Sequence, residues 1–333
     1  MEFKQMTIED IPAMAKLLIE RQNLESRVFP FLKNSNLHVN YITDLLAGWF
    51  TNKQMIGIGA FINSELVGYI IGELKHDTVR GRHIWGHYEG VAIRADQSPE
   101  LIRSLYAKAS EAWVAQGCFM HYMLIPLGNQ VYYDACQRLS FFIQQVHGVM
   151  SMADYQPFEN VSDAEVRVAH KMDSTTLGKM SSIIQSYQNA APTFEPVLPE
   201  AVLEIKAGYE GIVEGNDETC LIAIKDMKEL GFQVYYPSMS NLMTPDNSVE
   251  LSVAGTYDVQ MGKGIGKKLM NEGYRLMKEK GYSTMVTDWR ITNLASSTFW
   301  PKCGFKPVAY RMVRYIDSNI AWANFDNPSL KLL

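Results

Sequence analysis

The sequence predicts two tandem α/β domains, of the kind also called α+β, in a chain of 333 residues. That length is sufficient for two domains with separate hydrophobic cores. Two observations support the prediction. A strand pattern near residue 250 runs through a glycine-rich turn into a helix pattern, and the order of strand and helix patterns in the first half of the chain recurs in the second half.

The first domain is predicted at residues 1–155 and begins with a strand at 1–6. Thr7 follows, and Asp10 three residues later completes a pattern like the capping box that begins a helix. Apolar periods and turn residues predict the elements that follow. They are helices at 7–22 and 37–50, strands at 55–62, 65–74 and 85–92, a helix at 98–115, a strand at 118–125, a helix at 129–139 and a strand at 141–152.

The second domain is predicted at residues 162–333, after a linker at 156–163. Its first elements are a strand at 165–169, helices at 174–187 and 199–210, a hairpin of strands 218–225 and 231–236 that turns at 228–230, and a polar loop at 237–247. Its last elements are a strand at 283–289, a helix from 293 and a closing pair of strands at 305–316. Asn129 and Phe141 recur 164 positions later as Asn293 and Phe305. We therefore interpret the chain as a duplication.

The segment from 249 to 281 carries the clearest chemical signal. Apolar residues alternate with others from 249 to 253, as in a strand that is buried mainly on one face. Glycines then occupy positions 262, 264 and 266, and a helix pattern runs to Gly281. Glycines let a ligand approach the backbone, and the first amides of a helix have no intrahelical partner. The turn therefore predicts a pyrophosphate site, assisted by the helix dipole and by Lys263, Lys267 and Lys268.

Two other glycine-rich turns fit this segment less well. A phosphate-binding loop of the GxxxxGK[ST] type would end in Gly-Lys-Ser or Gly-Lys-Thr, whereas the turn here reads GKGIGKK. A dinucleotide-binding turn reads GxGxxG, with an acidic residue closing the next strand about 20 residues later. Here the turn is GxGxG, and the next strand ends in Asp288-Trp289-Arg290. A nucleotide-dependent enzyme is therefore the weaker alternative.

The turn and a later segment together resemble the GNAT N-acetyltransferase superfamily. In that family a strand leads into [RQ]xxGxG[AG], and a second motif reads N-x-x-[AS]-x-x-[LF]-[YF]-x-K-x-G-F. The second motif is matched by Asn293, Ser296, Phe299, Lys302, Gly304 and Phe305. Two positions depart from the pattern, because Met261 stands where Arg or Gln is usual and Trp300 stands where a Tyr often serves as general acid.

The resemblance covers most of the chain in element order and about residues 250–310 at the level of motifs. It implies two tandem GNAT-like domains, each a mixed central sheet flanked by helices. It also implies that acetyl-coenzyme A (acetyl-CoA) is bound as a cosubstrate. No metal is expected, because His83 and His87 have no third ligand in the pattern.

The resemblance further implies which residues contact the coenzyme. The backbone of Ala254 and Thr256 would meet the pantetheine arm, Asn293 would lie near the same arm, and Lys302 would meet the 3′-phosphate. Trp300, at the usual Tyr position, is included among the coenzyme contacts. The pyrophosphate would be held by the amides of Met261, Gly262, Lys263, Gly264, Ile265, Gly266 and Lys267.

Acetyl transfer to an amine needs a base for the amine proton and donors for the tetrahedral oxyanion. In similar enzymes a Glu on the core strand often serves as the base, and Glu250 aligns with it. Tyr257 is the phenol nearest to the turn and is the candidate to replace the acid absent at position 300. The ordinary alternatives are a solvated surface glutamate and a packing tyrosine.

The first domain lacks an equivalent of the glycine turn. Residues 95–100 read ADQSPE, so there is no glycine, and Pro99 has no N–H to donate. Glu100 places a carboxylate in the first helical turn, where it would repel a pyrophosphate. We expect a degenerate copy that packs on the second domain or shapes its substrate cleft.

Composition limits the class of protein and partner. Apolar residues make up 47% and charged residues 20%, which is ordinary for a globular protein. The net charge of -5 argues against nucleic acid or an anionic membrane as partner. The four cysteines form no CxxC pair, and the N-terminus shows no signal-peptide pattern, which favours the reducing cytoplasm.

We therefore expect a cytoplasmic N-acetyltransferase that transfers acetyl from acetyl-CoA directly to a primary amine in a ternary complex. The acceptor class stays open between a small molecule and a peptide. The oligomeric state also stays open, a homodimer included. The alternative from another class is a non-catalytic acyl-CoA-binding sensor or scaffold.

Overall fold

The computed structural model describes residues 1–32, 38–159, 161–215 and 217–323. The first residue of the helix predicted at 37–50 and residue 160 of the predicted linker lie outside the described residues. The chain forms two compact units. The first unit consists of Met1–Val146, Asn241–Pro245 and the segment from Pro307, and the second unit consists of His147–Ser240 and Asp246–Lys306.

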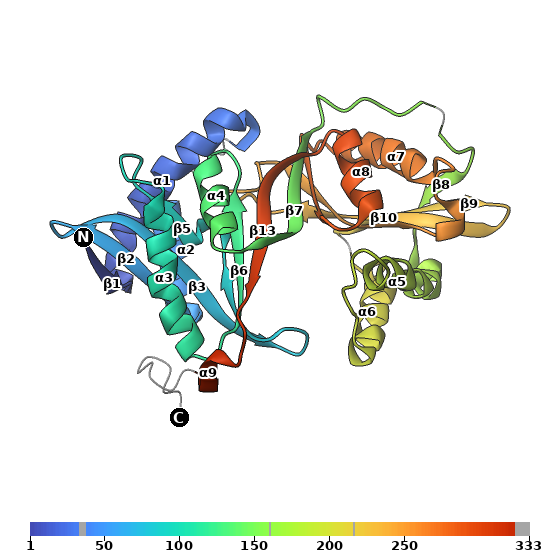
Figure 1. Cartoon of the computed structure of the whole chain (residues 1–333). Coiled ribbons are helices and arrows are strands. Elements are labelled where there is room, and N and C mark those ends of the chain that lie inside the picture. Colours follow the sequence, from blue (N-terminus) through green and yellow to red (C-terminus); the bar gives the residue numbers. More distant parts are fainter. Residues whose placement is uncertain (33–37, 160, 216, 324–333) are drawn as a thin grey trace. The chain divides into compact units, whose positions relative to one another are not determined.

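The first unit has a mixed sheet with the strand order β1-β2-β3-β4-β6-β13, and β5 pairs with β3 (Figure 1). β4 is parallel to β6, whereas β13 is antiparallel to β6. Strand β13, the last one in the described part of the chain, therefore belongs to the first unit's sheet. The elements are β1 (Glu2–Gln5), α1 (Ile11–Val28), α2 (Val39–Asn52), β2 (Met55–Ile62), β3 (Glu65–Asp77), β4 (Gly81–Gly86), β5 (Val91–Ile93), α3 (Glu100–Ala115), β6 (Met120–Pro126), α4 (Gln130–Arg138) and β13 (Lys306–Tyr315).

Helices cover both faces of the first sheet because strand side chains alternate between the faces. In β3, Ile70 belongs to one core cluster together with Leu105 of α3. Its neighbours Tyr69 and Ile71 belong to another cluster together with Leu18 of α1. The sheet is thus packed between α1 and α2 on one face and α3 and α4 on the other.

The second unit has a mixed sheet with the order β7-β12-β11-β10-β9-β8. β11 is antiparallel to β10 and parallel to β12. Strand β7 (Phe142–Ser151) enters from the first unit. The other elements are β8 (Glu165–Val168), α5 (Ser174–Asn189), α6 (Pro199–Gly211), β9 (Thr219–Lys225), β10 (Lys228–Ser238), β11 (Ser248–Thr256), α7 (Ile265–Glu279), β12 (Thr284–Arg290) and α8 (Leu294–Lys302).

Matching local details in the two units confirm the duplication. The predicted capping box exists, since the Thr7 N–H donates to Asp10 Oδ2 over 2.8 Å, and His170 and Asp173 repeat it 163 positions later. Asn129 and Asn293 each cap the helix that follows. The predicted α/β class, in which mixed sheet is flanked by helices in each unit, is confirmed by the strand order and the helices.

Three element predictions are wrong in detail. The strand predicted at 85–92 is the end of β4, a 3-10 turn at Tyr88–Gly90, and β5, because Gly90 packs closely against the β3 backbone. The hairpin between β9 and β10 turns at Asp226 and Met227, both with positive φ, although neither is a glycine. The closing pair of strands is one strand, β13, which pairs with β6 from Ala309 to Tyr315.

The Arg167–Asp173 pair ties β8 to the start of α5. Two guanidinium N–H groups donate to the two carboxylate oxygens over 2.8 and 2.7 Å, and the His170 N–H donates to Asp173 Oδ2 over 2.9 Å. The hydrogen bonds from Arg167 lower the pKa of Asp173 to about 2. This carboxylate therefore prefers its charged form in the folded protein.

We expect Asp173 to make the second unit acid-sensitive. A depressed pKa stabilises the fold above the unfolded value near 4, and the contribution is lost as the pH falls toward 2. In urea unfolding, the free energy of unfolding of the wild type should fall between pH 5 and pH 2.5 by about 1 kcal/mol more than that of Asp173→Asn, with solvent screening taken into account. Asp10→Asn is the matched control, because that capping box has no arginine in its hydrogen bonds. An equal pH dependence in Asp173→Asn and wild type would contradict the assignment.

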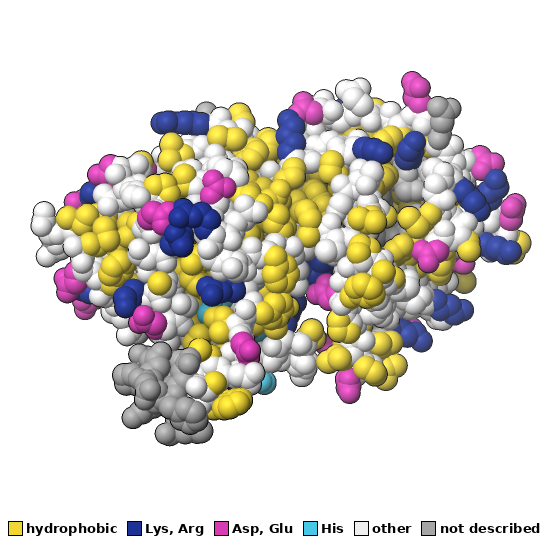
Figure 2. All heavy atoms as spheres, in the orientation of Figure 1, with side chains coloured by type: hydrophobic (Ala, Val, Ile, Leu, Met, Phe, Trp, Pro, Cys, Tyr) yellow, Lys and Arg dark blue, Asp and Glu magenta, His cyan; other side chains and the backbone are white. Residues whose placement is uncertain are grey.

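The visible surface mixes charges of both signs. Figure 2 shows basic and acidic side chains interspersed over the face in view. In the described part of the chain, no helix combines the length and the apolar character needed to cross a membrane. All four cysteines are buried and free.

Candidate functional site

The glycine turn joins β11 to α7 in the second unit. A short 3-10 turn at Asp258–Gln260 follows β11, and α7 begins at Ile265. Gly262 and Gly264 have φ values of 75° and 77°, in the left-handed region that disfavours side chains. Gly264 is the N-cap residue of α7. The glycines at these two positions are therefore required by the backbone path.

Some of the predicted amide donors are used inside the turn. The Met261 N–H donates to Asp258 O over 3.0 Å, and the Lys263 N–H donates to Gln260 O over 3.3 Å. The first bond into α7 runs from the Lys268 N–H to Gly264 O. The amides without a partner among the described residues are those of Gly262, Gly264, Ile265, Gly266 and Lys267. These five remain available to an anion at the positive end of the helix.

Strands β11 and β12 are paired only at their start. The parallel ladder ends at the pair Glu250–Val286, and the Thr287 hydroxyl then donates to Leu251 O over 2.7 Å. The register of β11 against β10 shifts by one residue at Ser252, which is a β-bulge. A bulge bends its strand and increases the local twist. β11 therefore leaves β12 beyond Glu250 and continues with β10 to Thr256.

The backbone of Ala254 and Thr256 faces the side that β12 has left. The Tyr257 N–H donates to Leu230 O over 3.1 Å, which makes Thr256 and Gly231 a non-hydrogen-bonded pair. Alternation then directs the N–H and C=O groups of both Thr256 and Ala254 away from β10. The Thr256 carbonyl accepts a hydrogen bond from the Tyr187 hydroxyl over 3.3 Å.

Glu250 and Tyr257 lie at opposite ends of this stretch. Glu250 is a surface residue at the point where the strands part. Partial burial raises the pKa of Glu250 above its ordinary value, and the charge of Asp288 on β12 raises it further. Glu250 and Thr256 are six residues apart in one strand, which corresponds to about 20 Å at the usual rise per residue. Tyr257 follows directly after Thr256.

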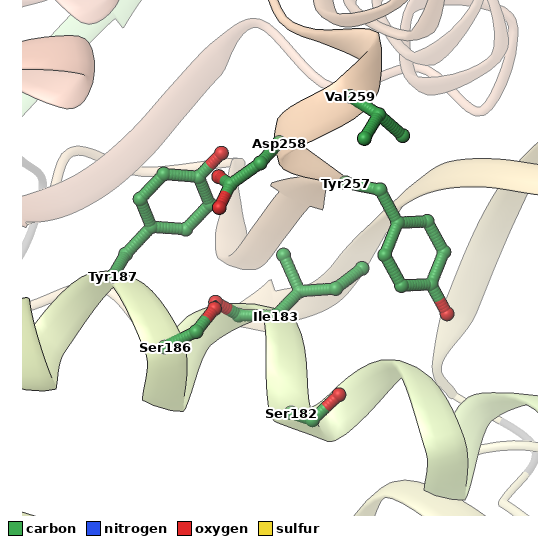
Figure 3. Close-up of a pocket in the computed structure, with 7 residues that line it drawn as sticks. All are labelled: Ser182, Ile183, Ser186, Tyr187, Tyr257, Asp258 and Val259. Atoms are coloured by element: carbon green, nitrogen blue, oxygen red, sulfur yellow. The ribbon is translucent and has the colours of Figure 1, made fainter.

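A pocket of ≈ 290 Å³ lies between α5 and the end of β11 (Figure 3). Tyr187 points toward the Asp258 carboxylate, and Tyr257 lies on the other side with its hydroxyl directed away from Asp258. Burial raises the pKa of Tyr187, and its hydrogen bond with Asp258 adds to that shift. Sequence reasoning missed Tyr187, because it occupies an ordinary position in a predicted helix.

The predicted residues of α8 are mainly structural in their visible contacts. Asn293 Oδ1 accepts from the Ser296 N–H over 3.1 Å and so caps its own helix. Trp300 is only 7% exposed, and its ring meets Phe299 and Phe305 edge to face. Lys302 is exposed at the end of the helix.

A segment of the predicted linker lies against the same helices. The Phe158 ring stacks on Phe299, and Lys267 Nζ lies 5.5 Å from the centre of the Phe158 ring. Asn271 of α7 accepts from the Phe158 N–H over 2.9 Å and donates to its carbonyl over 2.9 Å. Lys267 therefore has an aromatic neighbour that the sequence did not indicate.

No protein-family model matches the sequence, and no curated protein matches it either. Solved structures do. A GCN5-related N-acetyltransferase from Sphaerobacter thermophilus is similar over 94% of this chain and 95% of its own, with a TM-score of 0.59 and 11% identity. A tandem GNAT protein from the clavulanic acid biosynthesis pathway is similar over 94% of this chain and 97% of its own, with a TM-score of 0.51 and 12% identity.

A third similar structure is a fungal multi-domain beta-N-acetylglucosaminidase with a GCN5-related glucosamine N-acetyltransferase region. It covers 94% of this chain and 38% of its own length, with a TM-score of 0.53 and 11% identity. Identities at this level establish the fold and leave the activity to be argued from the site. The duplicated units and these three structures together show that the chain has the tandem GNAT fold.

Proposed function

We propose that this chain is an N-acetyltransferase that moves the acetyl group of acetyl-CoA to a primary amine by direct transfer in a ternary complex. The observation that supports it most is a line of backbone groups in the second unit that no neighbouring strand pairs. It begins at the free amides of the α7 turn and continues through Thr256 and Ala254 to the point where β11 and β12 part. An extended molecule with a diphosphate at one end matches that line.

The diphosphate end belongs at the start of α7. Its amides, the dipole of a 15-residue helix and the nearby lysines all favour an anion. The pantetheine arm contains amide groups, which can pair with the Ala254 C=O and with the N–H and C=O groups of Thr256. For the Thr256 carbonyl to be used, the 3.3 Å hydrogen bond from Tyr187 must be exchanged for one from the arm.

The thioester end then lies near Glu250. The amine nitrogen attacks the thioester carbon, and Glu250 accepts the amine proton directly or through a water molecule. The Ala254 N–H faces the side of β11 that β12 has left, and it can donate a hydrogen bond to the developing oxyanion. Collapse of the tetrahedral intermediate breaks the carbon–sulfur bond, the coenzyme departs as a thiolate, and that thiolate takes a proton from solvent. The products are an amide and free coenzyme A.

The separation of Glu250 from Tyr257 assigns them different tasks. A distance of about 23 Å over seven extended residues is too great for both to act on one carbon atom. We therefore assign proton transfer to Glu250. Tyr257 contributes to the wall of the pocket at the diphosphate end.

Asp288→Asn is expected to move the acid limb of the kcat/KM profile to lower pH. The Asp288 charge raises the pKa of Glu250, so its removal lowers that pKa. Only the carboxylate form accepts a proton, so activity is lost as the pH falls through the pKa of Glu250. A pH profile of kcat/KM for both proteins measures the shift. An unchanged limb, or a shift to higher pH, would show that Glu250 does not control it.

The proposed function is tested with acetyl-CoA and a panel of primary amines. Calorimetry measures thioester binding, and release of free thiol measures turnover. Amine-dependent thiol release is expected. Binding without turnover across small amines and peptides would favour the acyl-CoA sensor, and no binding heat with acetyl-CoA would overturn the coenzyme site itself.

A further inference from the structure

The two units can be aligned through one backbone hydrogen bond that occurs in both. In the first unit the Arg94 N–H donates to Val67 O over 2.9 Å. In the second unit the Tyr257 N–H donates to Leu230 O over 3.1 Å, and both partners lie 163 positions later in the chain. The parallel ladders correspond as well, since β4 and β6 share three pairs before they part, as β11 and β12 do.

This alignment matches Val91 with Ala254 and Ile93 with Thr256. Because the register is the same, the backbone groups of Val91 and Ile93 also face away from the antiparallel neighbour, which is β3. The first unit therefore has its own stretch of gap-facing backbone. In the second unit the corresponding stretch is where we place the pantetheine arm.

In the first unit side chains occupy two of these four groups, the Val91 carbonyl and the Ile93 N–H. One nitrogen of Arg21, Nη1, donates to Val91 O over 2.6 Å and to Tyr88 O over 2.7 Å. The Ile93 N–H donates to the Tyr132 hydroxyl over 3.2 Å. Arg21 and Tyr132 are 1% and 2% exposed, so both side chains lie within the core of the unit.

Glu25 makes a similar contact next to strand β6. It lies one helical turn after Arg21 on α1, and its Oε2 accepts from the Gly128 N–H over 2.6 Å, just beyond the end of β6. A Cβ at Gly128 would collide with the Glu25 side chain. Arg21 thus connects α1 to the backbone at Tyr88 and Val91, and Glu25 connects α1 to the backbone that follows β6.

The second unit has smaller or uncharged residues at the matching positions. The capping boxes set the offset of the first helices at 163, so Arg21 matches Ile184 and Glu25 matches Gln188. The Asn caps set the offset of the later helices at 164, so Tyr132 matches Ser296. None of the three replacements carries a guanidinium, a carboxylate or a phenol.

We propose that Arg21, Tyr132 and Glu25 close the first unit's coenzyme slot from within, so that the chain binds one acetyl-CoA, in the second unit. This inference rests on the proposed function of the second unit. Several polar atoms of these side chains are not hydrogen-bonded. Arg21 Nε and Nη2, Glu25 Oε1 and the Tyr88 hydroxyl are buried and have no hydrogen-bond partner among the described residues. Such groups are costly to bury, and replacing Arg21 and Glu25 together leaves no buried charge without its partner, so we expect the second unit's residues to be tolerated here.

The first test counts acetyl-CoA sites by calorimetry. The wild type should bind one equivalent, and a chain with the second unit's turn blocked by Gly264→Val should bind none. Two equivalents bound by the wild type would overturn the closure of the first unit. An absence of binding to the wild type would instead overturn the proposed function.

The second test opens the slot with the triple variant Arg21→Ile, Glu25→Gln, Tyr132→Ser, which carries the second unit's residues. Pantetheine is the probe, because it needs no diphosphate cradle. In the variant, pantetheine should slow amide hydrogen exchange at residues 87–94 by about threefold or more, with no such effect in the wild type. Wild-type exchange protection in β3 and β6 reports that the first unit is folded, and Tyr132→Ser alone is the milder alternative, because it leaves Arg21 and Glu25 together. Folded variants that show no protection at 87–94 would overturn the role of these side chains.

Discussion

Gly264→Val should abolish acetyl-CoA binding while the chain remains folded. Gly264 caps α7 at a φ of 77°, and a valine there would both strain the backbone and place a branched side chain beside the free amides. Loss of two charge-assisted hydrogen bonds to a diphosphate, at about 1.5–3 kcal/mol each, corresponds to a rise in Kd of roughly 100-fold or more. Calorimetry with acetyl-CoA measures this change.

The matched control is Gly281→Val, at the opposite end of the same helix. Gly281 has a φ of 90°, and nothing lies within 4 Å of a Cβ built there. Both variants should lose about 1–2 kcal/mol of stability from left-handed strain, since neither glycine can be replaced without it. Only Gly264→Val should lose the ligand. Equal affinity in the two variants would show that the start of α7 does not hold the diphosphate.

Glu250→Gln should reduce kcat about 10²- to 10⁴-fold, the usual contribution of a general base. Glutamine keeps the size of the side chain and cannot accept the amine proton, so acetyl-CoA affinity should remain close to the wild-type value. The residual rate should also lose the acid limb that the raised pKa of Glu250 produces. Thiol release over a range of pH measures both effects.

Glu165→Gln is the control for this variant, because Glu165 is an exposed glutamate on β8 of the same unit. Its kcat should match the wild type. Glu250→Asp should recover part of the lost rate, since it restores a carboxylate at a shorter reach. A Glu250→Gln enzyme with wild-type kcat would exclude Glu250 as the base. Another group would then accept the amine proton through a water molecule.

Local sequence patterns predicted most helices and strands. They failed where a turn interrupts a strand pattern without a local signal. The capping box at Thr7 and the Asn caps of α4 and α8 were readable, because each depends on neighbours within three residues. The break after Gly86 was not readable, because the close approach of Gly90 to β3 is a contact between distant residues. The turn at Asp226–Met227 lacked the glycine that usually signals a two-residue hairpin.

The sequence by itself determined the duplication, the strand–turn–helix at residues 248–279 and the glycines that its backbone needs, because these depend on residue periods and on the φ angles that only some residues adopt readily. Only the tertiary structure decided which backbone groups are free. Arg21 looks like any helical arginine in the sequence, yet its partners Tyr88 and Val91 are 67 and 70 residues away. Burial and hydrogen-bond partners of this kind are set by packing between distant segments, which no local pattern encodes.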